Sequence, residues 1–166
     1  MTETVLIDPF QNPETLRYFE DYVPGSIYEF GQITATEDEI IEFGRKFDPQ
    51  EFHVDPDKAR DTHFGGLIAS GWHTASLMMR LFGTHYLSNA SSLGSPGISN
   101  LRWLAPVRPG DELSIRVQIL LARRSSSKPD RGIVSSNIEV QNQDGVVVMD
   151  LTAVNLIASR ETALQD

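Results

Sequence analysis

The chain of 166 residues has a mass of 18.5 kDa, the size of one domain, and contains no cysteine. The lack of cysteine excludes disulfide scaffolds, thiolate metal sites and cysteine nucleophiles. Fourteen basic and 23 acidic residues give a net charge of −9, the opposite of the basic surface that nucleic-acid binders carry. No apolar run approaches the roughly 20 residues of a membrane span, and no secretory signal opens the chain. We therefore expect a cytoplasmic protein that binds neither nucleic acid nor membrane.

The sequence predicts one domain with a short extension at each end. Residues 1–24 contain three prolines and predict an N-terminal arm, whereas residues 25–160 form the expected domain and residues 161–166 a tail. Three aromatic side chains are available to dock the arm: Tyr18, Phe19 and Tyr22.

Short elements follow the arm. Residues 28–33 are typical of a strand. Thr36 precedes three acidic residues and predicts a helix N-cap, and this helix ends at Asp48-Pro49 because proline disfavours helical backbone before it. Asp55-Pro56 predicts a second N-cap, followed by a helical turn to about Arg60.

The second half predicts a buried helix followed by an antiparallel sheet. Residues 70–82 are apolar on most sides, which is typical of a helix inside a core. Asp144-Gly145 predicts a type I′ hairpin turn. The fold class is therefore α+β, with a sheet wrapped around one helix. Four strands are expected, at residues 98–104, 112–124, 131–143 and 146–158. In the second of these, five alternating side chains are expected to face one way: Leu113, Ile115, Val117, Ile119 and Leu121.

Residues 47–55 are the first candidate for chemistry. Asp48 and His53 are five positions apart in a segment expected to bend, so their side chains can converge on one water as a general acid–base pair. In the structural alternative, Asp48 only ends a helix and His53 packs beside Phe52. Asp55 is expected to serve as a helix cap. The four histidines have no convincing metal-ligand spacing, so we expect no metal site.

The opening of the long helix is the second candidate. The first amides of a helix lack intrahelical partners and lie at its positive end. A glycine at position 71 lets a ligand approach the backbone, so the Gly71 N–H can meet an oxyanion that forms on a carbonyl. In the structural alternative, Ser70 is an ordinary N-cap and Gly71 allows close packing.

Residues 47–76 resemble the MaoC-like dehydratase family, which includes the (R)-specific enoyl-CoA hydratases. The family's Asp-x-Asn-Pro-x-His-x-Asp segment has Gln50-Glu51 here in place of Asn-Pro. The resemblance extends over about residues 25–158 and implies a hotdog fold and a homodimer. The matching positions are Asp48, His53 and Asp55 in the first segment, Ser70-Gly71 at the helix opening, Ser76 as the family's later serine, and Trp103 where an aromatic is common.

The resemblance implies reversible hydration of a trans-2-enoyl-CoA to an (R)-3-hydroxyacyl-CoA without a cofactor. Asp48 and His53 would hold and deprotonate the water, and the Gly71 N–H would form the oxyanion hole. A hotdog thioesterase and a non-catalytic acyl-CoA-binding protein remain alternatives. Ser70, Trp72 and Ser76 are the expected substrate-binding residues, and Trp72, Met78, Met79 and Phe82 are candidates for an acyl tunnel.

Coenzyme A carries phosphates, so an acidic protein needs local cations to bind it. The basic loop at residues 123–131 is the best candidate. Five cations are available for this role: Arg102, Arg108, Arg123, Arg124 and Lys128.

Overall fold

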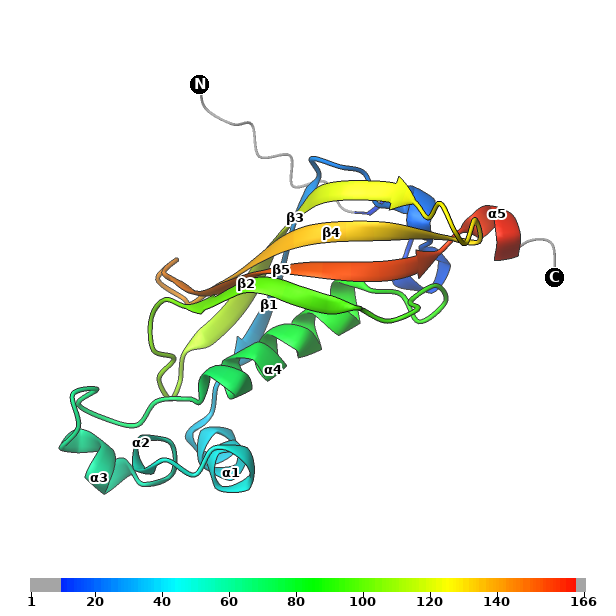
Figure 1. Ribbon diagram of the computed structural model, residues 1–166. Helices are drawn as coiled ribbons and strands as arrows, with labels where there is room; N and C mark the ends of the chain where they lie inside the picture. Colours follow the sequence, from blue (N-terminus) through cyan, green and yellow to red (C-terminus); the bar gives the residue numbers. More distant parts are fainter. Residues whose placement is uncertain (1–9, 164–166) are drawn as a thin grey trace.

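The computed structural model describes residues 10–163, in which a five-stranded antiparallel sheet curves around one long helix (Figure 1). The strand order is β1-β3-β4-β5-β2. This α+β arrangement is the hotdog fold, as predicted. No helix in the described part has the length and apolar character needed to cross a bilayer. The strands are β1 (Ile27–Thr34), β2 (Gly97–Trp103), β3 (Glu112–Arg124), β4 (Arg131–Gln141) and β5 (Val147–Ala158). The helices are α1 (Glu37–Phe47), α2 (Glu51–Val54), α3 (Pro56–Arg60), α4 (Gly71–Leu81) and α5 (Arg160–Ala163), with shorter turns η1 (Glu14–Leu16), η2 (Phe19–Asp21) and η3 (Phe82–Tyr86).

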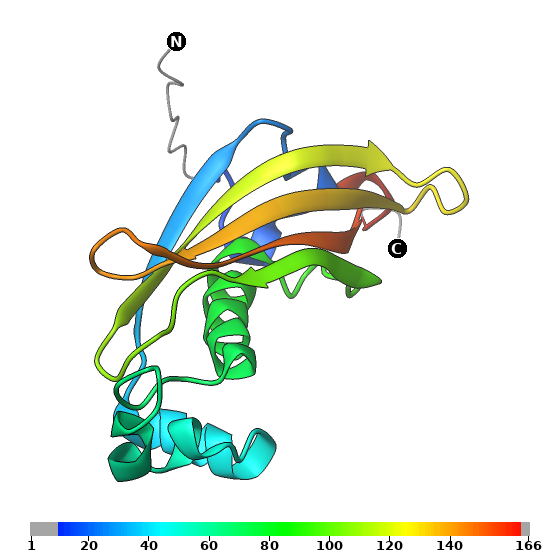
Figure 2. The ribbon, with the colours of Figure 1, turned by 60° about the vertical axis from the view of Figure 1, so that its left-hand side comes forward.

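The core lies between α4 and the concave face of the sheet. Helix α4 continues into η3, a π-helical turn, and the two together run across the sheet (Figure 2). Burial of apolar side chains on both elements is the main stabilising term of the fold. The prediction that this segment is a buried helix is confirmed for one face, but Trp72 and Met79 are about half exposed on the other. The buried face carries Leu77, Met78, Leu81, Phe82 and Tyr86.

Strand β3 alternates as predicted only over its first part. Its inward side chains from Leu113 to Ile119 are almost fully buried, but Leu121 is 46% exposed, so that prediction is wrong for Leu121. The pairing with β4 shifts between Ile119 and Leu121, which leaves Leu120 as an extra residue. Because side chains alternate every second residue, one inserted residue turns all that follow to the opposite face.

The hairpin between β4 and β5 forms, but not with the predicted type I′ turn. Gly145 has a φ of +74°, whereas Asp144 is not among the described residues with positive φ. A type I′ turn needs positive φ at both positions. Instead, the side chain of Asn142 accepts hydrogen bonds from the amides of Asp144 and Val146, both at 3.0 Å. This side chain stabilises a longer loop that ends on a left-handed glycine.

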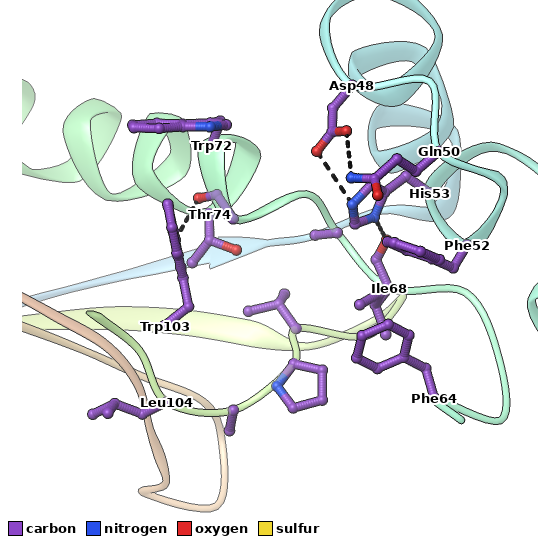
Figure 3. A pocket seen from close by; sticks show the side chains of 15 residues that line it. Asp48, Gln50, Phe52, His53, Phe64, Ile68, Trp72, Thr74, Trp103 and Leu104 are labelled. Carbon is purple, nitrogen blue, oxygen red and sulfur yellow. Dashed lines mark hydrogen bonds and ion pairs between the residues drawn. The ribbon is translucent and has the colours of Figure 1, made fainter. Parts of the chain in front are cut away.

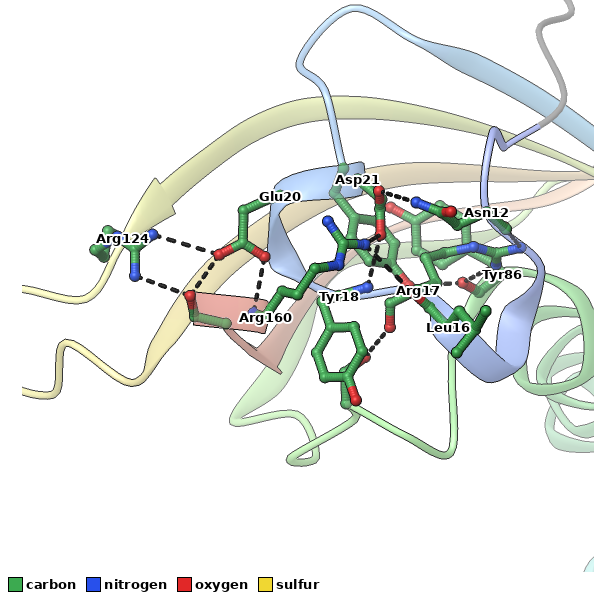
Figure 4. Close-up of polar contacts among 12 residues, drawn as sticks. Asn12, Leu16, Arg17, Tyr18, Glu20, Asp21, Tyr86, Arg124 and Arg160 are labelled. Carbon is green, nitrogen blue, oxygen red and sulfur yellow. Dashed lines mark hydrogen bonds and ion pairs between the residues drawn. The ribbon is translucent and has the colours of Figure 1, made fainter. Parts of the chain in front are cut away.

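The described part of the N-terminal arm packs against the C-terminal end of the central helix (Figure 4). Arg17 is buried, and its Nη1 donates to the backbone oxygens of His85 and Tyr86, both at 2.8 Å. These carbonyls lack partners within the helix and lie at its negative end, so a buried cation is favourable there. The Tyr22 hydroxyl also donates to the Tyr86 oxygen, at 2.8 Å. Residues 1–9 and 164–166 of the expected arm and tail lie outside the described part.

Candidate active site

Helices α1, α2 and α3 form a small helical layer beside the N-terminal end of α4 (Figures 1 and 2). The Thr36 cap accepts from the Glu39 amide at 3.3 Å, and Asp55 caps α3, so both predicted caps are confirmed. Helix α2 was not predicted. It packs so closely on α1 that a Cβ added to Gly44 would lie 2.9 Å from the His53 oxygen. This close approach brings the end of α1 next to His53.

Asp48 and His53 converge, as Figure 3 shows. The His53 Nε2 lies 3.2 Å from the Asp48 Oδ2, and the imidazole is buried. The other ring nitrogen, Nδ1, lies 2.8 Å from the backbone oxygen of Ile68. Because a carbonyl oxygen only accepts, Nδ1 carries the proton in this contact. The Nε2 atom is therefore the nitrogen directed at Asp48.

The Asp48 carboxylate is held by two further donors. The Ser70 hydroxyl donates to Oδ2 at 2.7 Å, and the Gln50 side-chain amide donates to Oδ1 at 2.8 Å. Partial burial by itself raises the pKa of Asp48, but the hydrogen bonds from Ser70 and Gln50, together with attraction to His53 in its protonated form, outweigh it and lower the pKa. Asp48 is therefore ionised at neutral pH.

Gly71 begins α4 beside a tryptophan from the sheet. The Trp103 Nε1 donates to the Gly71 oxygen at 2.9 Å, and a Cβ added to Gly71 would lie 2.4 Å from the Trp103 ring. Only glycine fits here without a shift of the indole. Among residues 10–163, none accepts a hydrogen bond from the Gly71 N–H. This amide is therefore available to a ligand at the positive end of the helix.

One cavity of about 450 Å³ joins these groups. Asp48, His53 and Gly71 all line it, and so does Trp72. Its remaining walls are mostly apolar, which suits an acyl group. Large side chains form much of these walls: Phe52, Phe64, Ile68, Trp103, Leu104 and Val107.

Two of the predicted substrate-binding residues do not line this cavity. Ser70 is fully buried, where it caps α4 through the Trp72 amide and holds Asp48. Ser76 is exposed, and its hydroxyl donates to the Trp72 oxygen at 2.8 Å. Of the residues expected to line an acyl tunnel along α4, only Trp72 lines this cavity. Met78 and Phe82 belong to the core.

The cations expected to bind phosphates are mostly paired or remote. Arg102 pairs with Asp150 at 2.6 Å. Arg124 pairs with Glu20 and Glu161. Residues 123–131 connect β3 to β4 at the end of the sheet far from α1, α2 and α3 (Figures 1 and 2). The best candidate loop is therefore far from this cavity, because the long strands carry it to the opposite end of the sheet.

Sequence reasoning missed several members of the site. The Ile68 carbonyl that orients His53 has no signal in the sequence, because any residue supplies such an oxygen. The walls from Phe64 and Pro106 come from loops whose apposition depends on the whole fold. Gln50 had a signal, since it stands at the amide position of the family segment, and its amide indeed contacts Asp48. No group of three or more His, Asp or Glu side chains in the described part is arranged to hold a metal ion.

His73, on the side of α4 that packs against α1, provides a test of pH-dependent stability. It is buried and stacks on Phe43, and its Nδ1 has no hydrogen-bond partner. Burial lowers its pKa from 6.5, although the charge of Glu39 acts in the opposite direction. The unfolded chain therefore takes up a proton on His73 more readily than the folded one. The contribution of neutral His73 to stability is fully present above pH 6.5 and declines as the pH falls below it.

We expect His73→Leu to make the free energy of unfolding less sensitive to acid below pH 6.5. Urea unfolding above and below this pH measures the slope, which is independent of any constant loss from the missing ring contact. An unchanged slope would show that the protonation of His73 does not affect folding. Exposed His63 serves as the control, because its replacement by Leu should leave the slope as it is.

The fold, and the cavity that Asp48, His53 and Gly71 line, define a hotdog protein with a candidate active site at the opening of its central helix. A family model described as the MaoC like domain matches residues 21–141. The chain therefore belongs to the MaoC-like dehydratase family.

Three similar proteins illustrate this relationship. The crystal structure of the MaoC-like dehydratase from Rhodospirillum rubrum is 38% identical, with a TM-score of 0.80, and the match covers 87% of this chain and 98% of that one. The (R)-specific enoyl-CoA hydratase of Rhodospirillum rubrum is 30% identical over 108 residues, 63% of this chain and 70% of the relative. The uncharacterized protein YdeM of Bacillus subtilis is 27% identical over 131 residues, 79% of this chain and 92% of the relative.

Proposed function

We propose that this protein catalyses the reversible addition of water to a trans-2-enoyl-CoA, which gives an (R)-3-hydroxyacyl-CoA. The observation that carries the proposal is the convergence of Asp48 and His53, 3.2 Å apart, on the cavity that also contains the Gly71 amide. The name of the (R)-specific enoyl-CoA hydratase among the relatives supports the substrate and the stereochemistry.

The pair would activate water as two acceptors. In its neutral form, with the Nδ1 proton donated to Ile68, His53 presents a lone pair on Nε2, and ionised Asp48 presents a carboxylate. A water molecule can donate one O–H to each, which directs its own lone pair into the cavity. One of the two groups takes a proton from the water as its oxygen attacks C3, and the same group then returns that proton to C2, so that both groups end as they began.

The Gly71 amide would stabilise the charge that this attack creates. Addition at C3 moves electrons onto the thioester oxygen, which gains its charge only as the reaction proceeds. A preorganised N–H at a helix N-terminus is worth more to this oxyanion than to the ground-state carbonyl, so it lowers the barrier. The Trp103 indole donates to the Gly71 oxygen, which lies in the next peptide group, and so holds the residue that carries this N–H in place.

The simplest test measures loss of the conjugated enoyl-thioester absorbance with crotonyl-CoA, followed by chiral analysis of the product. We expect hydration to the (R) product. A parallel measurement of free thiol distinguishes a thioesterase, which releases coenzyme A. Binding of acyl-CoA with neither reaction, over short and long acyl chains, would contradict the proposal in favour of a non-catalytic protein.

We also propose that two copies associate through the β2 edge. Within residues 10–163, strand β2 pairs with β5 alone, so its outer edge has unpaired backbone groups in this part of the chain. Exposed apolar side chains lie on and beside it, including Ile98 and Leu104, at 52% and 49% exposure. Light scattering should give about twice the chain mass of 18.5 kDa, and Ile98→Lys should shift it toward one chain. A wild-type mass of one chain at micromolar concentration would refute the dimer.

A further inference from the structure

Arg108 lies at the rim of the cavity on the loop between β2 and β3. It directly follows two residues that line the cavity, Pro106 and Val107. Its Nη2 donates to the backbone oxygen of a third lining residue, Phe64, at 2.5 Å. Beside the guanidinium is Gly66, where an added Cβ would lie 3.4 Å from Nη1. The half-buried guanidinium is therefore held in place at the edge of the site.

Within residues 10–163, no carboxylate oxygen lies within 4.0 Å of a guanidinium nitrogen of Arg108, so no ion pair neutralises this cation. The nearby acid Asp111 is already used: it accepts from the Arg108 backbone amide at 2.8 Å and from the Gln143 side chain at 3.0 Å. A guanidinium without an acidic partner keeps its remaining hydrogen-bond donors available for an external anion.

We propose that Arg108 binds a phosphate of the thiol carrier, coenzyme A or phosphopantetheine, to which the acyl group is attached. The inference rests on the proposed function, because it assumes a thioester substrate. The cavity interior is lined mainly by apolar side chains, which suit the acyl group, whereas Arg108 stands outside that lining. An anion that contacts Arg108 therefore belongs to the part of the substrate that stays outside the cavity, which is the phosphate-bearing thiol carrier.

Charge gives this residue its importance. The protein has a net charge of −9 and repels a polyanionic substrate at long range. A fixed guanidinium opposes that repulsion locally and binds phosphate oxygens through two parallel N–H groups. The other cations considered for this role are engaged with carboxylates or lie at the far end of the sheet.

The test places the same crotonyl group on three thiols: coenzyme A, 4′-phosphopantetheine and pantetheine. For Arg108→Gln we expect the KM for crotonyl-CoA to rise about tenfold with little change in kcat, the usual effect of losing a charged hydrogen bond. The phosphate-free pantetheine thioester should react as with the wild type, which also shows that the variant folds. Arg108→Lys should restore part of the affinity, since it keeps the charge but not the paired donors.

The intermediate thiol identifies the phosphate. If the 4′-phosphopantetheine thioester shares the loss, Arg108 binds the phosphate that coenzyme A and carrier proteins have in common; if only crotonyl-CoA shows it, Arg108 binds a nucleotide phosphate. Arg45→Gln, on the exposed face of α1, makes the same change in net charge and should leave all three KM values unaltered.

Equal KM values for Arg108→Gln and wild type with all three thioesters would overturn the phosphate inference while leaving hydration intact. If the wild type turns over none of the three, the proposed function fails instead, and the two failures are therefore distinguishable.

Discussion

Asp48→Asn is expected to slow hydration of crotonyl-CoA by about 10²–10⁴-fold, the range typical for loss of a general base. Asparagine has nearly the same shape and can still hydrogen bond to Ser70 and Gln50, so we expect the fold and the substrate KM to change little. The lost function is the ability to accept a proton. Steady-state kinetics and thermal unfolding of the same preparations separate these two effects.

Glu51→Gln is the matched control for this prediction. Glu51 is a carboxylate three residues away, but its side chain is exposed and pairs with Lys58 at 2.6 Å. The same chemical change should therefore leave the rate unaltered. A comparable loss in both variants, or full activity of Asp48→Asn, would contradict a catalytic role for Asp48.

The acid side of the pH profile adds a second readout. Burial raises the pKa of Asp48, but hydrogen bonds from Ser70 and Gln50 and attraction to His53 in its protonated form outweigh it and lower the pKa from 3.8. We therefore expect the carboxylate to stay ionised down to below this pH, so that its protonation causes no loss of activity nearer neutrality. A decline of activity between neutral pH and about pH 5 that disappears in Asp48→Asn would contradict the lowered pKa of Asp48.

Gly71→Ala has the second large expected effect. The added Cβ would lie 2.4 Å from the rigid Trp103 ring, so either the indole or the start of α4 must move. We expect kcat to fall by about 10²–10³-fold, as for the loss of an oxyanion-hole donor. Overpacking should also reduce the free energy of unfolding by about 1–3 kcal/mol. Both values come from one preparation, by kinetics and denaturant unfolding.

Two further variants separate catalysis from packing. Gly83→Ala on the continuation of α4 meets only Met79, at an ordinary 3.6 Å, and should have little effect on either value. Combining Gly71→Ala with Trp103→Ala removes the clash. The double variant should therefore lose less free energy of unfolding than the two single variants lose together. If the loss in the double variant equals the sum of the two single losses, the indole and position 71 do not interact.

Local signals in the sequence predicted most of the elements well. Thr36 and Asp55 each supply a side-chain oxygen directly before a helix, and both helices begin there. Errors occurred where a single residue changed the pairing: the extra Leu120 turned Leu121 outward, and the Asn142 side chain stabilised a different hairpin loop. Such effects depend on the partner strand or on a competing side chain, which propensity and alternation do not include.

The sequence by itself determined which residues could supply the chemistry of this protein. A carboxylate, an imidazole and a glycine at a helix opening are present in the family's spacing, and local rules placed each near the end of an element. Only the tertiary structure decided that they meet. The Gly44 contact brings α1 onto α2, the Ile68 carbonyl orients His53, and Trp103 from a distant strand packs on Gly71 and donates to its carbonyl oxygen. These contacts join positions far apart in the chain, and their geometry follows from packing of the whole core rather than from any local pattern.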